Sequence, residues 1–410
     1  MAKKFEEIKE EEYPYELPEG WKWERLGKCV NLSANKTELF LDSTKYVGLE
    51  NIEKDTGIIK YEIGAELKSI KNVFVEGQIL YGKLRPYLNK HGIAKFKGVC
   101  STDILVFSAN NDVSNKWVDY YFNMPSFISY AISNSTGINL PRVNSKSILS
   151  YVIPIPPKET QQKIVDIIES LFAKLDIAQE KVEQVLAESE NRRSAILHNA
   201  FSGKLTEKWR EENNVSFDSW KECKFGDICK FIGGGTPRKD NDEYWNGNIN
   251  WASIKDIKGK YLNSTTDFIT EKGLNNSSAN LCSIGELIIG TRINPGKPII
   301  SNIETAINQD LKIVKSKLNT EFLYYLFTVN NKKIESLSSG STVLGIGLKI
   351  LNNIEIDIPK EEEQKEIVRL LDKFLSVEDK VKSTCQNTLE AIATMRKSIL
   401  AKAFRGELCS

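Results

Sequence analysis

The chain contains two long stretches in which hydrophobic residues recur every three or four positions, the spacing of an amphipathic helix. One stretch covers 164–196 and the other covers 367–399, and neither contains Pro or Gly. Each follows a proline, Pro157 or Pro359, and stops near a glycine, which is the usual punctuation of a helix. We therefore expect two continuous helices of about 40 residues, or about 60 Å each at 1.5 Å per residue.

A heptad pattern predicts which side chains form the apolar seam of each helix. We expect the two helices to pack against one another in antiparallel orientation and their surfaces to dock a partner. The alternative is that each helix packs only on a neighbouring globular domain. The predicted seam and docking residues are Ile164, Ile168, Leu171, Leu175, Ala178, Val182, Val185 and Ile196 in the first stretch, and Ile367, Leu371, Phe374, Val381, Ile392, Met395 and Ile399 in the second.

The two helical stretches are copies of one another. Residues 153–205 align with 356–408 at a constant offset of 203 without a gap, and 16 of 53 positions are identical. Unrelated sequences would share about three positions, so the identity indicates an internal repeat. The helix ends show it best, because SAILHNAFSGKL at 194–205 recurs as KSILAKAFRGEL at 397–408.

The blocks that precede the helices share fainter marks, such as Trp21-Lys22 with Trp220-Lys221 and GQILYG at 77–82 with GELIIG at 285–290. Short alternating runs (KYVGL, ILVFSA, NINWASI, LKIVKS) predict strands, and KWVDYYFNM and TEFLYYLFTV predict short helices. The fold class is therefore α/β (mixed α+β), with two duplicated globular domains separated by two long helices in an antiparallel coiled coil with pseudo-two-fold symmetry. The expected boundaries are 1–152 for the N-terminal segment and first domain, 153–205 for the first helix, 206–355 for the second domain and 356–410 for the second helix.

Composition changes this picture little. The net charge is +1, and the globular blocks carry 17 Lys+Arg against 14 Asp+Glu at 16–152 and 19 against 18 at 206–355. Such a balance neither proves nor excludes a DNA-binding groove. No apolar run approaches the roughly 18 residues of a membrane span, and the start is too acidic for a secretory signal, so we expect a cytoplasmic protein. Seven cysteines without a C-x-x-C pair predict reduced thiols rather than a disulfide framework or zinc fingers.

Few residues indicate catalysis. Phe231-Ile-Gly233-Gly-Gly235 has the spelling of an S-adenosylmethionine loop, but the chain lacks the Asn/Asp-Pro-Pro-Tyr/Phe segment that would hold a flipped base. Glu66-Leu-Lys68 and Asp310-Leu-Lys312 resemble a nuclease triplet, which is common by chance. The chain has two histidines in 410 residues, so acid–base catalysis or metal binding by histidine has little support. We expect no catalytic residue, metal or cofactor in this chain.

Several loops instead mix cations, aromatic rings and amides, which are the groups that contact bases and phosphates. For any single residue, a solvated surface turn is an equally good interpretation, and it is the collection on two duplicated domains that favours nucleic acid. The candidate DNA-binding residues are Lys83, Arg85, Tyr87, Arg142, Asn144 and Lys146 in the first domain, and Thr236, Arg238, Lys239, Trp251, Ser253, Lys255, Arg292 and Asn294 in the second.

Across essentially its whole length, the chain resembles the specificity subunit of Type I restriction-modification enzymes. The resemblance rests on LPEGWKWERLG and WKECKFGDI, on GQILYGKLRPYL and GGGTPRKDNDEYWNGNINWASIKDI, on IPIPPKETQQKIV and IDIPKEEEQKEIV, and on AFSGKL and AFRGEL. It implies that each globular block is a target recognition domain for one half of a bipartite, asymmetric site in double-stranded DNA. It also implies that the helices space these domains and dock two modification (methyltransferase) subunits.

Restriction (endonuclease/translocase) subunits would attach through the modification subunits, and S-adenosylmethionine, ATP and Mg would act in those partners. Two other functions stay open at this point. A single-chain DNA methyltransferase would need its own cofactor site, and a coiled-coil adaptor would have no affinity for DNA.

Overall fold

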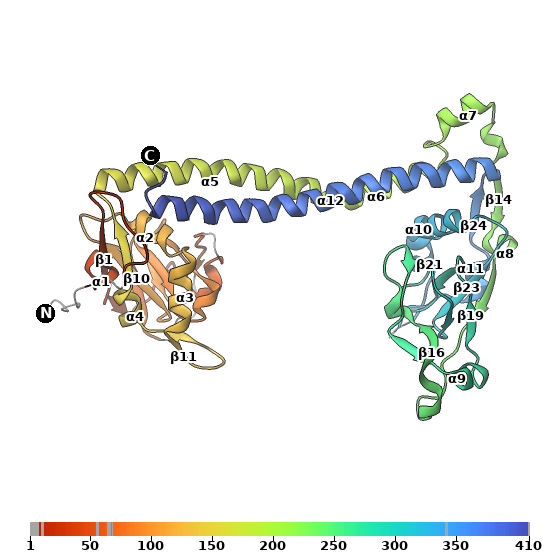
Figure 1. The fold of residues 1–410 in the computed structure, drawn as a ribbon, viewed down its shortest axis with the longest axis horizontal. Helices are drawn as coiled ribbons and strands as arrows, with labels where there is room; N and C mark the ends of the chain where they lie inside the picture. Colours follow the sequence, from red (N-terminus) through yellow and green to blue (C-terminus); the bar gives the residue numbers. More distant parts are fainter. Residues whose placement is uncertain are drawn as a thin grey trace. The chain divides into compact units, whose positions relative to one another are not determined.

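The computed structural model describes residues 8–9, 12–54, 57–63, 67, 69–340 and 343–408. It divides into two compact units (Figure 1). Unit 1 combines Met1–Glu183 with Gln386–Ser410, and unit 2 spans Gln184–Cys385. The boundaries of the compact units therefore fall inside the two long helical stretches.

Unit 1 contains two sheets with the strand orders β2-β10-β7-β8 and β3-β6-β9-β4-β5. A separate antiparallel pair, β1 with β13, joins the start of the domain to the strand that leads into the first long helix. The strands are β1 (Lys22–Arg25), β2 (Val30–Leu32), β3 (Lys36–Thr37), β4 (Lys45–Val47), β5 (Glu62–Ile63), β6 (Lys71–Phe74), β7 (Ile79–Gly82), β8 (His91–Ile93), β9 (Gly98–Cys100), β10 (Ile104–Ala109), β11 (Ser135–Thr136), β12 (Arg142–Val143) and β13 (Val152–Ile155).

Unit 2 repeats this plan with the orders β15-β23-β20-β21-β17 and β18-β16-β22-β19, and with β14 paired to β24. Its strands are β14 (Lys221–Lys224), β15 (Lys230–Gly233), β16 (Trp245–Ala252), β17 (Tyr261–Leu262), β18 (Asp267–Ile269), β19 (Asn280–Cys282), β20 (Leu287–Gly290), β21 (Pro298–Ser301), β22 (Thr305–Ile307), β23 (Leu311–Lys315) and β24 (Glu355–Ile358).

The strand pairings show that the globular blocks are duplicated as well as the helices. In the second sheet of each unit, β4–β9 and β16–β22 are parallel, whereas the flanking pairs β6–β9 and β19–β22 are antiparallel. Unit 1 adds β3 to this sheet, and unit 2 adds β17 to its first sheet. The predicted mixed α+β fold with two duplicated domains is therefore confirmed.

The two units contain shorter helices as well. They are α1 (Leu26–Cys29), α2 (Asn115–Tyr121), α3 (Pro125–Ser133) and α4 (Ser145–Ser150) in unit 1, and α7 (Glu207–Asn213), α8 (Phe225–Ile228), α9 (Glu271–Asn275), α10 (Thr320–Ser336) and α11 (Leu348–Asn352) in unit 2. Within the described residues, no helix is both long and apolar enough to cross a membrane.

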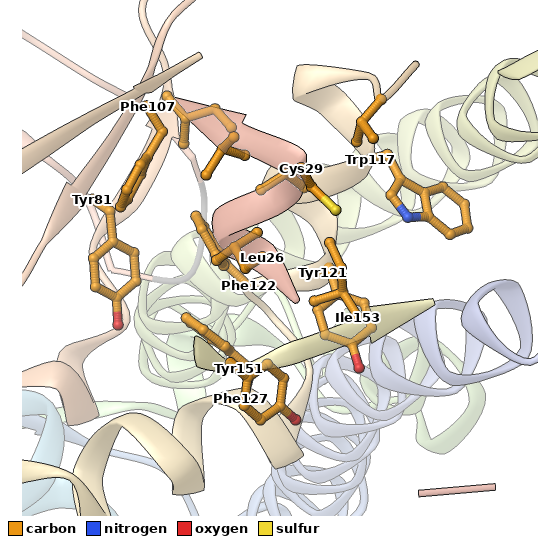
Figure 2. Close-up of a cluster of buried hydrophobic side chains, with 14 of the residues drawn as sticks. Leu26, Cys29, Tyr81, Phe107, Trp117, Tyr121, Phe122, Phe127, Tyr151 and Ile153 are labelled. Atoms are coloured by element: carbon orange, nitrogen blue, oxygen red, sulfur yellow. The ribbon is translucent and has the colours of Figure 1, made fainter. Parts of the chain in front are cut away.

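The core of unit 1 joins its sheet to both long helices. Figure 2 shows aromatic side chains from β7, β10, α2 and α3 gathered around Leu26 and Cys29. The ring of Phe404, at the end of the C-terminal helix, lies 4.7 Å from the rings of both Trp117 and Tyr121 (centroid to centroid) and is fully buried. The helix end is therefore part of the domain core.

The long helices are α5 (Lys158–Ala187), α6 (Ser189–Phe201) and α12 (Glu361–Phe404). The predicted starts after Pro157 and Pro359 and the ends before Gly203 and Gly406 are confirmed. The first long helix is assigned as α5 and α6 because of an irregularity at Glu188. Glu188 nevertheless has right-handed helical angles, and its N–H and carbonyl still bond to the carbonyl of Gln184 at 3.2 Å and the N–H of Arg192 at 3.0 Å, so the helical path continues through it.

The helices pack in antiparallel orientation within each unit. In unit 1, Ile164 and Ile168 share a core with Leu400 and Phe404, and Figure 1 shows α5 beside the C-terminal part of α12. In unit 2, residues near the end of α6 share a core with Ile367 and Leu371 at the start of α12. The predicted antiparallel pairing is therefore present, and each helix also packs on its neighbouring domain.

Three residues that were predicted to lie in the buried seam are partly exposed, so the prediction is wrong for them. Val185, Phe374 and Met395 are 38%, 37% and 52% exposed. In each case the next residue, Leu186, Leu375 or Arg396, is turned further from solvent. A straight helix drifts about 20° per heptad relative to a strict 3.5-residue repeat, so a seam assigned by heptads moves off the buried face.

The thiols fit the expectation of reduced cysteines. The six described cysteines are free, and Cys29, Cys100, Cys229 and Cys282 are buried, which raises the pKa of each to about 12. Cys409 lies outside the described residues, as do Glu66 and Lys68 of the first nuclease-like triplet.

Candidate nucleic-acid interface

Two loops of unit 1 are tied together by backbone hydrogen bonds, and these bonds bring the predicted residues together. The N–H of Lys83 donates to the carbonyl of Asp103 at 2.9 Å, and the N–H of Arg85 donates to the carbonyl of Pro141 at 2.7 Å. The N–H of Val143 returns to the carbonyl of Lys83 at 3.0 Å. The loop after β7 therefore lies against the segment that leads into α4.

A carboxylate that the sequence reasoning missed lies at the centre of this loop pair. Asp103 Oδ1 and Oδ2 accept hydrogen bonds from Arg142 Nε at 3.1 Å and from Nη2 at 3.2 Å. Lys83 Nζ lies 3.7 Å from the same Oδ1. The hydrogen bond to Asp103, followed by its charge, raises the pKa of Arg142 above its ordinary value. The cluster keeps a net positive charge of one.

The other candidates of unit 1 lie around this cluster. Arg85 and Tyr87 are exposed, and Arg85 has left-handed backbone angles with φ 53°. Asn144 caps α4, since its Oδ1 accepts the N–H of Ser147 at 2.8 Å, so this oxygen is already used. Lys146 is exposed on α4. Five of the six candidates, Lys83, Arg85, Tyr87, Arg142 and Lys146, are cationic or aromatic residues of these loops. The sixth, Asn144, stabilises the start of α4.

Unit 2 repeats the same backbone frame with different side chains. Thr291 donates to the carbonyl of Asp310 at 2.8 Å, Ile293 donates to Leu344 at 2.8 Å, and Ile346 donates to Thr291 at 2.9 Å. Ile293 has φ 70°, which is unusual for a β-branched residue, and it occupies the position that Arg85 has in unit 1. The frame is thus kept although its sequence has diverged.

Beside this frame, unit 2 has an open cavity of about 750 Å³. Five of the predicted residues line it, namely Thr236, Lys239, Trp251, Ser253 and Lys255. The remaining lining residues, which the sequence reasoning did not name as DNA-binding candidates, are Gly235, Asp242, Trp245, Asp267, Ser278, Asn308, Gln309 and Asp310. The structure therefore brings loops from three separate stretches to one site.

Three of the predicted residues shape the cavity wall, and their polar groups are already used. Trp251 is 6% exposed, its indole N–H donates to the carbonyl of Gly235 at 3.1 Å, and its ring meets that of Trp245 edge-on with centroids 5.2 Å apart. The Ser253 hydroxyl donates to Asp256 at 3.1 Å. Thr236 donates to Gln309. These contacts fix the wall rather than leave groups free for DNA.

The two lysines that line the cavity differ in whether a nearby carboxylate offsets their charge. Lys255 Nζ lies 2.7 Å from Asp267 Oδ2, and this hydrogen bond raises the pKa of Lys255. Lys239 is exposed at the rim. Outside the cavity, Arg238 pairs with Asp240 at 2.9 Å, Arg292 Nη1 lies 3.2 Å from Asp310 Oδ1, and Asn294 is exposed in the same loop.

Gly234 and Gly235 serve close packing. A Cβ at Gly234 would lie 2.2 Å from the carbonyl oxygen of Ile307, and one at Gly235 would lie 2.2 Å from Ser278 Oγ. The segment follows β15 and enters a loop. A nucleotide-binding glycine loop instead leads from a strand into the start of an α-helix, so this segment lacks the required context. Among the described residues, no cluster of His, Cys, Asp or Glu could hold a metal ion.

A sequence signal could have found the missed carboxylates. Ser101-Thr-Asp103 and Asn308-Gln-Asp310 each place an aspartate directly before a strand of the first sheet, β10 or β23. Asp310 was considered only as part of the nuclease-like triplet with Lys312. The repeat itself therefore marked these positions.

Comparison with known proteins gives consistent matches. The family model described as "Type I restriction modification DNA specificity domain" matches residues 18–187 and 218–391. The chain is 33% identical over 201 residues to the EcoDI specificity subunit of Escherichia coli, covering 48% of this chain and 45% of the relative. It is 25% identical to the EcoKI specificity subunit of Escherichia coli strain K12, covering 76% and 68%.

A solved chain from a study of the assembly and conformational transition of the type I R-M system has the same fold. The two superpose with a TM-score of 0.79 at 22% identity, covering 96% of this chain and 100% of the other.

Proposed function

Because the chain belongs to the Type I restriction modification DNA specificity domain family, we propose that each of its two units reads one half of a split, asymmetric site in double-stranded DNA. The observation that carries this proposal is the duplicated loop frame. The same three backbone hydrogen bonds are donated by Lys83, Arg85 and Val143 in unit 1, and by Thr291, Ile293 and Ile346 in unit 2. One scaffold with two sets of side chains suits two readers of two sequences.

The chemistry of the two loop sets fits DNA. Arginine recognises guanine edges, lysine neutralises phosphate, and both kinds of residue lie at these sites. Acidic partners hold several of the cations, so the domains stay near neutral overall while presenting local positive charge. Sequence-specific contact and positioning on phosphate can then come from neighbouring side chains.

The long helices would dock two modification subunits, with restriction subunits attached through them. Val185, Phe374 and Met395 are partly exposed apolar side chains on these helices, and they are positions at which such a partner would make contact. Adenine methylation and ATP-dependent cleavage would reside in those subunits, with S-adenosylmethionine, ATP and Mg²⁺ bound there. The complex would act in the cytoplasm.

The test is to map methylated bases in cells that carry this chain with its modification partner and in matched cells that lack this chain alone. We expect methylation at a two-part motif that disappears with the chain. A single-chain methyltransferase would methylate the motif without a partner, and purified chain would bind S-adenosylmethionine in equilibrium dialysis. An adaptor would leave the methylation pattern unchanged.

A further inference from the structure

Arg142 is held along one edge of its guanidinium. Nε and Nη2 donate to the two oxygens of Asp103, at 3.1 and 3.2 Å. Among the residues that the structure describes, the opposite edge, formed by Nη1 and the second Nη2 hydrogen, has no hydrogen-bond partner, and the side chain is 45% exposed. The free edge therefore faces away from the carboxylate and is open to a ligand.

The anchor itself is fixed. Asp103 lies directly before β10, its carbonyl accepts the N–H of Lys83, and its side chain is 25% exposed. A guanidinium is planar and rigid, so a carboxylate on one edge fixes the direction of the other. Restricting the side chain in advance reduces the entropy lost when DNA binds.

The free edge has a specific complement in DNA. Guanine presents two acceptors, O6 and N7, in the major groove, which match the two parallel N–H groups of an arginine edge. Adenine presents a donor at N6 in place of O6. An oriented arginine therefore distinguishes these bases, whereas a freely rotating one can turn to phosphate instead.

Unit 2 uses the equivalent carboxylate but reaches it from the other side. Leu84 and Arg142 form an isolated antiparallel β-bridge in unit 1, and Arg292 and Gly345 form one at the corresponding place in unit 2. The arginine is thus the second partner of the bridge in unit 1 and the first partner in unit 2. Arg292 Nη1 still lies 3.2 Å from Asp310 Oδ1. Asn308 Nδ2 also donates to Asp310, at 3.2 Å. The carboxylate is the constant feature, and the segment that carries the arginine varies.

From this geometry we propose that Asp103 and Asp310 are positioning residues that present Arg142 and Arg292, respectively, to a guanine in each half-site. The proposal rests on the proposed function and names the base that each unit reads. It also predicts that the position of the guanine differs between the half-sites, because Arg142 lies in β12 whereas Arg292 lies in the loop after β20.

The experiment selects bound duplexes from a random DNA pool with the full chain in complex with its modification partner. Asp103→Asn keeps the side-chain shape but weakens the pairing, and Arg142→Lys keeps the charge but removes the second parallel N–H. We expect both variants to lose about tenfold or more of the preference for guanine over adenine at one position of one half-site. The other half-site should not change. Asp310→Asn and Arg292→Lys should do the same to the opposite half.

Glu361→Gln is the matched control, because it removes the same charge from an exposed ion pair with Lys365 on α12. It should leave discrimination at every position intact. Weaker binding to all sequences alike, or unchanged guanine preference in all four variants, would overturn the proposal. If the wild-type complex selects a split target in either case, the proposed function stands and only this inference fails. If it selects no sequence, the proposed function fails as well.

Discussion

Arg193 Nη1 lies 2.6 Å from Asp379 Oδ1 across the two helices of unit 2. The repeat equivalents of these residues, Arg396 and Asp176, pair across the helices of unit 1. Both residue types are identical in the two copies of the repeat, so each copy supplies the arginine for one ion pair and the aspartate for the other. The internal duplication thus encodes the antiparallel pairing through two reciprocal contacts.

The reciprocal ion pairs predict the outcome of a charge swap. Arg193→Asp alone and Asp379→Arg alone place like charges opposite each other, and we expect each to lower the free energy of unfolding by about 0.5–1 kcal/mol, since the aspartate is largely exposed. The double variant should recover most of that loss in urea denaturation. Additive losses in the double variant would show that the residues do not interact.

The packing of the C-terminal helix end predicts a large effect at Phe404 and a small one at Phe374. Phe404 is fully buried against Trp117 and Tyr121, so Phe404→Ala should destabilise unit 1 by about 3–5 kcal/mol. Phe374→Ala lies on the same helix but is 37% exposed, and it serves as the control, with an expected loss below about 1 kcal/mol. Amide hydrogen exchange in α2 measures the effect in unit 1, and exchange in α10 measures the effect of Phe374→Ala in unit 2. Equal protection in both variants would contradict the observed seam.

The helices could be predicted closely because their signals are local. Periodicity located α5, α6 and α12, and prolines and glycines located their ends. The exact buried face could not be predicted in the same way, since Phe374 and Leu375 are both apolar and adjacent. Only the accumulated turn of the helix against its partner decides which of them is buried.

The candidate site was predicted as loops rather than as contacts. Arg142 and Lys83 were named because of their chemistry, but the carboxylate that joins them comes from a third stretch, at Asp103. Pairing in space between residues far apart in sequence leaves no local pattern. Trp251 and Ser253 were named for the same reason as the lysines, yet the indole N–H of Trp251 is used by the distant carbonyl of Gly235, and the hydroxyl of Ser253 is used locally by Asp256.

The cavity of unit 2 predicts unequal effects of its lysines on DNA binding. Lys239 is exposed, whereas the charge of Lys255 is offset by Asp267 at 2.7 Å. Removing a phosphate-contacting charge weakens binding uniformly across sequences and lowers the salt slope by about one. Lys239→Ala should therefore reduce affinity more than Lys255→Ala in titrations at several salt concentrations. Lys365→Ala on α12 is the control, and an equal loss there would place the DNA surface elsewhere.

The duplicated fold predicts that the two readers are exchangeable modules. Replacing 220–355 with the equivalent block of a relative should change one half of the methylated motif and leave the other half intact. The antiparallel pairing of β14 with β24 supports this design, because it places the two ends of the exchanged block side by side. Sequencing of methylated sites measures the result. A simultaneous change in both halves would mean that the units do not read separately.

The helices predict how the gap between half-sites is set. Inserting four residues after Glu183 and four after Cys385, at the boundaries between the units, lengthens each helix by about 6 Å, close to one turn. The apolar seam is then displaced by only a small angle. DNA rises about 3.4 Å per base pair, so we expect the preferred gap to grow by one or two base pairs with both half-site sequences unchanged.

Insertion of two residues at the same places provides the contrast. It rotates the following helix by about 200° and turns the seam toward solvent, so that variant should lose stability or partner binding. The two insertions differ little in length but strongly in phase, which separates the effect of distance from that of packing. Methylated-site mapping gives the gap directly. A four-residue variant that assembles, methylates and still prefers the original gap would show that the helices do not measure the distance.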